Sequence, residues 1–171
     1  MKKLSNFILI ILISVLFAGV YGIIHDQVTY TISPEYFTLL KFPQFGIEQL
    51  HWPVRLKVGM IGFLATWWVG LFLGFGYAFV SLLFNPENIL KVTLQSLFIN
   101  IGVTFILGIS GYIWSVFLLT QENISWYIPP GTQDIRNFIN VGSIHNFGYI
   151  GGIAGLIAGI AYLIRKQKPY R

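Results

Sequence analysis

The chain has 171 residues, of which 55% are hydrophobic and only 10% are charged, and its formal net charge is +5. A soluble domain of this size needs more charge to cover its surface, so the composition excludes a soluble globular protein. The sequence contains no cysteine, which excludes disulfides and thiolate chemistry, and it has no basic stripe of the kind that binds nucleic acid.

Long apolar stretches dominate the sequence. A helix needs about 20 apolar residues to cross the hydrocarbon core of a membrane. The first stretch follows Lys2 and Lys3, exceeds the length of a signal-peptide core and has no A-x-A-like cleavage site after it, so we expect an uncleaved anchor. The sequence thus predicts one all-α integral membrane domain over residues 1–171, with loops at 25–57 and 120–146. Four stretches qualify as spans: Phe7–Ile24, Val58–Phe84, Val92–Leu119 and Phe147–Ile164.

The distribution of Lys and Arg predicts the orientation, because cytoplasmic ends are enriched in both. With four spans the two termini share one side, and that side carries the larger set of basic residues. We therefore expect a multi-pass protein of a cell (inner) membrane with both termini in the cytoplasm. The side of the termini holds Lys2, Lys3, Lys91, Arg165, Lys166, Lys168 and Arg171, and the opposite side holds Lys41, Arg55, Lys57 and Arg136.

The first outer loop opens with alternating polar and β-branched or aromatic residues from Gln27 to Ser33. This period of two predicts a short strand. Ser33-Pro34-Glu35 then has the order of a helix start, with a capping Ser, Pro in the first turn and an acid at the positive helix end. We expect a short interfacial helix through Lys41, anchored by Tyr36 and Phe37.

Two regions of the central helices carry residues that are unusual in lipid. Trp67 and Trp68 lie near mid-membrane in the predicted second span, where they either pack against small residues of a neighbour or line a path together with Thr66. In the third span, Asn100 and other polar residues either hydrogen-bond between helices or line the same path.

The fourth helix can extend from about Gln133 to Arg165, well beyond its apolar span. Several of its glycines are spaced by four residues, which lets a neighbouring helix approach closely. These glycines are Gly148, Gly151, Gly152, Gly155 and Gly159.

One set of residues could carry chemistry at the outer face. Counted from the cytoplasmic ends of their helices, His25 and His145 reach similar depths, and His145 shares the helix face of Gly148. Asp26 and Glu35 are then within reach of both rings. Two imidazoles and one or two carboxylates can bind a divalent metal ion such as Zn²⁺ or Fe²⁺, or can transfer protons. Alternatively, both histidines cap helix ends and hydrogen-bond to loop backbone.

Three motifs carry a resemblance: HDQVTYTISPEYFT at 25–38, ATWWVGLFLG at 65–74, and His145 followed by Tyr149. In these the chain resembles a functionally uncharacterised family of bacterial multi-pass membrane proteins with HDQVT…EYFT and ATWWVG motifs. The resemblance implies no activity, and Ser33 stands where the family often has cysteine. It implies that the family features in this chain are His25, Asp26, Gln27, Thr29, Glu35, Tyr36, Trp67, Trp68 and His145.

Three hypotheses of function follow. The first is a site for a metal ion or small polar ligand at the outer face, formed by His25, Asp26, Glu35 and His145. The second is a structural or accessory subunit that packs its glycine-rich helix against another membrane protein or a second copy of the chain. The third is a small transporter with a path along Thr66, Trp67, Trp68 and Asn100. The sequence leaves open whether the protein is an enzyme.

Overall fold

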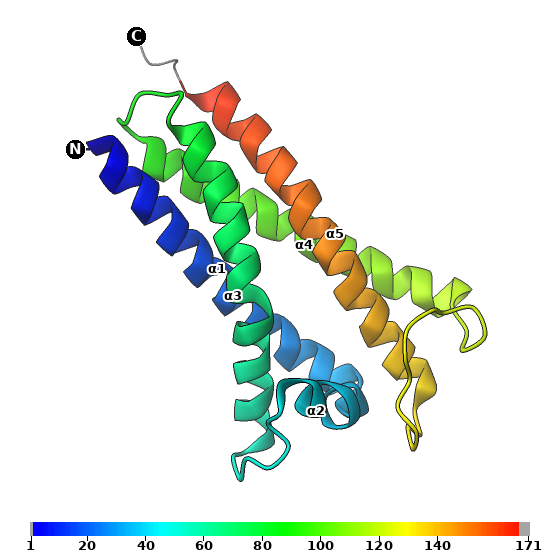
Figure 1. The fold of residues 1–171 in the computed structure, drawn as a ribbon. Coiled ribbons are helices and arrows are strands. Elements are labelled where there is room, and N and C mark those ends of the chain that lie inside the picture. The colour runs from blue at the N-terminus through cyan, green and yellow to red at the C-terminus, as the bar shows by residue number, and fades with distance from the viewer. Residues whose placement is uncertain (1, 168–171) are drawn as a thin grey trace.

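The computed structural model describes residues 2–167, which form helices and no strand. Its four long helices are α1 (Lys2–Ile32), α3 (Val54–Ser81), α4 (Ile89–Leu118) and α5 (Ile135–Lys166). Each is long and apolar enough to cross a membrane. The first residues of α1 and the last residues of α5 lie at the same end of the bundle (Figure 1). The predicted all-helical bundle, with four helices long and apolar enough to span a membrane, is confirmed.

The predicted strand at 27–33 is wrong, because α1 continues without a break to Ile32. An isolated strand has no partner for its backbone groups, whereas the helix satisfies them internally. The β-branched residues fit the helix by turning their hydroxyls onto its carbonyls. Thr29 donates to the His25 carbonyl at 3.1 Å, and Thr31 donates to the Gln27 carbonyl at 3.0 Å. The loop expected from residue 25 therefore begins only after Ile32.

The long helices associate as two pairs. α1 packs along α3 and α4 packs along α5, whereas contacts between the pairs are few. In the first pair Gly22 and Gly62 face each other so closely that neither has room for a side chain. Further along the same interface, a Cβ on Gly70 would lie 2.6 Å from the Ser14 carbonyl oxygen. Glycine thus sets the separation between α1 and α3.

The second pair confirms in part the packing predicted for the glycine-rich helix. A Cβ on Gly155 would lie 2.7 Å from the Asn100 carbonyl oxygen, and a Cβ on Gly151 would lie 2.7 Å from the Thr104 Cα. By contrast, a Cβ on Gly148 or Gly152 would meet no atom within 4 Å. Only one glycine row is therefore used for helix contact, and the other faces open space.

Residues 33–53, which we call the cap, fold back over one end of the two pairs. The cap contains a single π-helical segment, η1 (Tyr36–Lys41), followed directly by α2 (Phe42–Phe45). The Ser33 hydroxyl accepts a hydrogen bond from the Tyr36 amide at 3.3 Å, as predicted for a helix start. Tyr36 and Phe37 are not interfacial anchors, because they are only 6% and 0% exposed. They pack inward on Phe138 and its neighbours in α5 and α3.

Trp67 and Trp68 lie on the outward face of α3. They are 39% and 42% exposed in the chain alone, so they contact the surroundings of the bundle rather than its interior. Thr66, next to them, turns inward and donates to the Ala18 carbonyl of α1 at 2.8 Å.

Two glycines, one with close contacts and one without, test the role of close helix approach. We expect Gly155→Ala to destabilise the protein by about 1–3 kcal/mol, because the new methyl group overlaps the α4 backbone. The matched variant Gly102→Ala places its methyl group where no atom lies within 4 Å, so it should be neutral or stabilise by up to about 1 kcal/mol. Thermal unfolding in detergent measures both, and equal melting temperatures would contradict the packing account.

Candidate functional site

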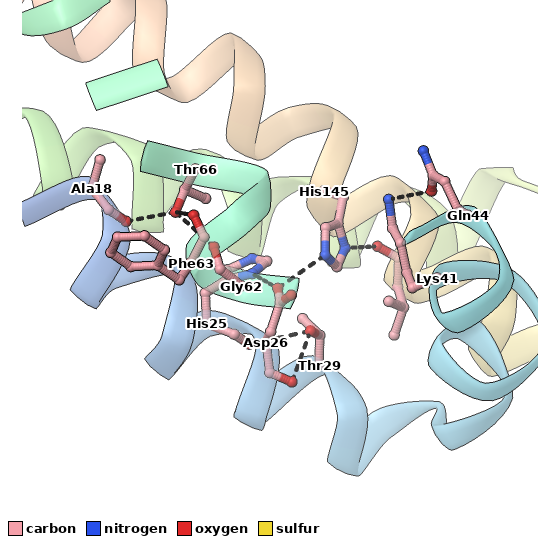
Figure 2. Close-up of polar contacts among 11 residues, drawn as sticks. Ala18, His25, Asp26, Thr29, Lys41, Gln44, Gly62, Phe63, Thr66 and His145 are labelled. Carbon is pink, nitrogen blue, oxygen red and sulfur yellow. Dashed lines mark hydrogen bonds and ion pairs between the residues drawn. The ribbon is translucent and has the colours of Figure 1, made fainter. Parts of the chain in front are cut away.

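The site forms where α1 meets α5 beneath the cap. Figure 2 shows His25 and Asp26 on α1 facing His145 on α5. Asp26 Oδ1 lies 3.1 Å from His25 Nδ1 and 3.3 Å from His145 Nε2. The two imidazole rings meet edge to face with their centroids 4.8 Å apart. The structure thus brings together three of the residues that the sequence selected, including both histidines from opposite ends of the chain.

The Asp26 side chain is removed from solvent. The residue is 4% exposed, and the side chains of His25 and His145 are also largely covered. A buried carboxylate is costly unless it is paired and hydrogen-bonded. Because the two imidazoles are the partners that the structure gives to this carboxylate, the three groups form one unit.

The backbone fixes the orientation of His145. Its Nδ1 lies 2.9 Å from the Val141 carbonyl oxygen, one turn earlier in α5. A carbonyl can only accept, so Nδ1 carries a proton and donates it. In neutral His145 the lone pair is then on Nε2, which faces the Asp26 carboxylate. Two acceptors face each other at this contact unless a proton or a metal cation lies between them.

Neither histidine caps a helix end. His25 lies well before Ile32, the last residue of α1, and His145 lies well after Ile135, the first residue of α5. The alternative that both histidines serve as helix caps bonded to loop backbone is therefore wrong. Their partners are a helical carbonyl, a carboxylate and each other.

Aromatic side chains of the cap cover the site. The Tyr36 ring stacks on His145 with centroids 5.0 Å apart, and Phe37 contacts the same imidazole edge to face. Burial raises the pKa of the Tyr36 phenol above its usual range, and the nearby Tyr149 and Asp26 raise it further. Tyr36 thus remains a neutral phenol that shields the cluster from the cap side.

The Lys41 ammonium group lies above this aromatic cover. Its Nζ is 5.6 Å from the Tyr36 ring centroid and donates to Gln44 at 3.2 Å. Burial lowers the pKa of Lys41, and the charge of Asp26 acts in the opposite direction. The cap therefore brings one cation close to the buried carboxylate without direct contact.

Below the site lies a cavity of about 90 Å³ between the two helix pairs, which we call the inner cavity. Its wall includes the site residues His25, Asp26 and His145. Thr66 and Asn100, two of the predicted path residues, also line it, but Trp67 and Trp68 are not part of its wall. The cavity joins the polar cluster to the interior of the bundle.

Glu35 does not join the cluster, in contrast to the prediction. Its carboxylate accepts hydrogen bonds from the backbone amides of Gln133 and Asp134, the nearest at 2.8 Å. Those amides precede the first turn of α5, where an acid is electrostatically favoured. Glu35 therefore fastens the cap to the start of α5, and the group of potential metal ligands is His25, Asp26 and His145.

Two aromatic residues lie near the site, of which the sequence analysis missed Tyr21 and named Tyr149 only as part of a motif, not as a site residue. The Tyr21 ring lies 5.5 Å from the His25 ring, and Tyr149 lines the inner cavity beside His145. Each stands four residues from a site histidine on the same helix. This spacing places side chains on one helix face, and it is the signal that could have identified both.

No protein-family model matches this chain, and no curated protein or solved structure shows significant similarity to it.

Glu35 offers a test of how the cap is held. Glu35→Gln weakens the hydrogen bonds to the amides of Gln133 and Asp134, so we expect a loss of about 1 kcal/mol in local stability. Amide hydrogen exchange at 133–134 and in η1 should become several-fold faster. Glu48→Gln, in the same cap with an exposed side chain, is the control. Unchanged exchange in Glu35→Gln would show that this carboxylate does not fasten the cap.

Proposed function

We propose that this chain is a multi-pass membrane protein that binds one divalent transition-metal ion through His25, Asp26 and His145. The observation that carries the proposal is the contact between His145 Nε2 and Asp26 Oδ1 at 3.3 Å, with Nδ1 of the same ring engaged by the Val141 carbonyl. A metal cation converts this contact between two acceptors into a pair of ligands. Histidine ligands commonly donate their second nitrogen to a backbone carbonyl in this way.

The distances also support a metal ion. One ligand atom from each of the three residues lies within 4.8 Å of the others. Tetrahedral Zn²⁺ with bonds of about 2.0–2.2 Å separates neighbouring ligand atoms by about 3.4 Å. The two separations from Asp26 Oδ1, 3.1 and 3.3 Å, are already near this value.

The types of ligand atom restrict the metal. Two imidazole nitrogens and one carboxylate oxygen suit Zn²⁺ and Fe²⁺ and are poor ligands for Mg²⁺ or Ca²⁺, which prefer oxygen. Three protein ligands leave at least one coordination position for water or another ligand, which is the arrangement of catalytic rather than structural zinc. The ion would act there as a Lewis acid beside the inner cavity.

We also propose that this site lies on the extracytoplasmic side of the membrane. The end of the bundle that holds the termini carries more Lys and Arg than the cap end, as the positive-inside rule requires of the cytoplasmic side. The cap and the site then face the periplasm or exterior.

A shared proton is the second way to resolve the contact between His145 and Asp26. In that case the two imidazoles and the carboxylate form a proton-transferring group without a metal. The same geometry favours both chemistries, and metal content distinguishes them.

Metal titration of purified protein tests the proposal. After removal of metals with a chelator, the wild type should bind about one equivalent of Zn²⁺, and His145→Ala and Asp26→Asn should each weaken binding by about 100-fold or more. Calorimetric titration gives the affinity, and elemental analysis gives the stoichiometry. Co²⁺ in place of Zn²⁺ reports nitrogen and oxygen ligands through its visible absorption.

His51→Ala is the matched control, because His51 is an exposed cap residue outside the cluster. It should bind metal like the wild type. Gel filtration and thermal unfolding establish that each variant is folded. A wild-type protein that binds no stoichiometric metal, or a folded His145→Ala variant with wild-type affinity, would refute the metal site.

A further inference from the structure

The inner cavity is long, narrow and apolar. Along α1 its wall extends from Ser14 to Asp26, which is about 18 Å of helix at 1.5 Å per residue. A volume of only about 90 Å³ over that length is a slot rather than a chamber. Phe17, Val69, Leu73 and Leu97 supply much of its surface. This elongated, mostly apolar wall matches the shape of a single hydrocarbon chain. The volume is smaller than the roughly 150 Å³ that holds one benzene molecule, so a chain would enter as the two helix pairs move apart.

The polar groups along the slot are already used within the protein. Ser14 donates to the Ile10 carbonyl at 2.8 Å, and Asn100 donates to the Gly152 carbonyl at 3.1 Å. Thr104 likewise donates to the Asn100 carbonyl at 2.9 Å. Since these groups are satisfied, they offer little to a hydrated ion or polar solute passing through the bundle.

Free hydrogen-bonding capacity is concentrated at the end of the slot that contains the site. Tyr21 and Tyr149 line it one helical turn from His25 and His145. Within residues 2–167 the Tyr21 and Tyr149 hydroxyls make no hydrogen bond to protein groups. A ligand with one polar end and one apolar chain matches this division of the wall.

A second cavity connects the site with the lipid-facing surface. It has a volume of about 330 Å³, lies between α1 and α4, and shares Tyr21 and His25 with the inner cavity. We call it the lateral cavity. Its wall includes Ile24, Val28 and Phe105, which are exposed apolar residues on helices able to cross a membrane. Its volume lies within the range of about 300–1,000 Å³ that is typical of small-molecule sites.

Glycines in the sequence leave open space between the two helix pairs. Gly148 and Gly152 border the inner cavity, and Gly108 borders the lateral cavity. A Cβ on Gly148 or Gly152 would meet no atom within 4 Å, and a Cβ on Gly108 would meet only Ile144 at 3.7 Å or more. These three glycines therefore keep space open rather than bring helices together.

We propose that the site takes a single-chain amphiphile, with a small oxygen-bearing head at His25, Asp26 and His145 and its hydrocarbon chain in the inner cavity. The molecule reaches the site from the bilayer through the lateral cavity. This inference rests on the proposed function in that the head group occupies the free coordination position of the metal ion. It identifies the substrate class as a membrane lipid with one apolar chain.

Photolabelling with palmitic acid that carries a mid-chain diazirine tests this proposal. The full chain is reconstituted in nanodiscs of phosphatidylethanolamine and phosphatidylglycerol, irradiated, and analysed by peptide mass spectrometry. We expect crosslinks on α1 between Ser14 and Tyr21 and on α4 between Leu97 and Thr104. An excess of unlabelled palmitate should reduce these crosslinks by about tenfold or more, as expected for a site that saturates.

Cavity-filling variants provide the control. Gly152→Leu fills the slot from α5 and Ala65→Leu fills it from α3, so each should reduce cavity labelling by about tenfold. Gly102→Leu adds the same side chain on α4 at a position outside the walls of both cavities, and should label like the wild type. If Gly152→Leu does not fold, Ala65→Leu decides the question.

The possible outcomes separate the two proposals. Labelling confined to outward-facing residues overturns the amphiphile proposal. Cavity labelling also overturns it if unlabelled palmitate does not compete and the folded cavity-filling variants label like the wild type. Stoichiometric Zn²⁺ without cavity labelling overturns the amphiphile alone. Cavity labelling in a chain that binds no Zn²⁺ supports the amphiphile and refutes the metal ion.

Discussion

A buried carboxylate between two imidazoles is the interaction on which the arrangement of this bundle depends. Asp26 sits at the few residues where α1 approaches α5, although α1 packs mainly on α3 and α5 mainly on α4. Because a buried carboxylate must find partners, its pairing with His145 ties one helix pair to the other. The cap adds to this connection through Tyr36, which stacks on His145. The chemistry of the site and the assembly of the bundle are therefore the same set of contacts.

Glycine determines where the bundle is tight and where it is open. Within each pair, glycines such as Gly62 and Gly155 bring two backbones together, so each pair behaves as a firm unit. Between the pairs, Gly148 and Gly152 leave space that no side chain fills. In a bilayer the hydrophobic effect does not favour closing that space, because lipid chains contact apolar side chains as favourably as other protein side chains do. Cavities beside the site are thus compatible with a stable fold.

The sequence predicted features that depend on composition and on helix geometry. The four helices able to span a membrane follow from apolar length, and the meeting of His25 with His145 follows from counting helix depth. The alternating pattern gave a wrong strand prediction at Gln27–Ser33, because β-branched residues indicate a strand only when a partner strand exists. Glu35 was wrongly assigned to the site from its closeness in sequence. Its carboxylate instead accepts hydrogen bonds from the backbone amides at the start of α5. The inner cavity could not be predicted, because it depends on how the two helix pairs separate.

The electrostatics of a metal ion here would favour one kind of head group. A divalent cation with neutral His25 and His145 and ionised Asp26 leaves one net positive charge in a site covered by Tyr36 and Phe37. In such a poorly hydrated place a charge interacts strongly with its neighbours, so a counter-charge at the open coordination position would be strongly stabilising. Lys41 lies close by and carries the same sign, so it cannot provide that counter-charge. A carboxylate head on an apolar chain would satisfy both demands at once, since its charge would neutralise the ion while its chain would extend into the slot below.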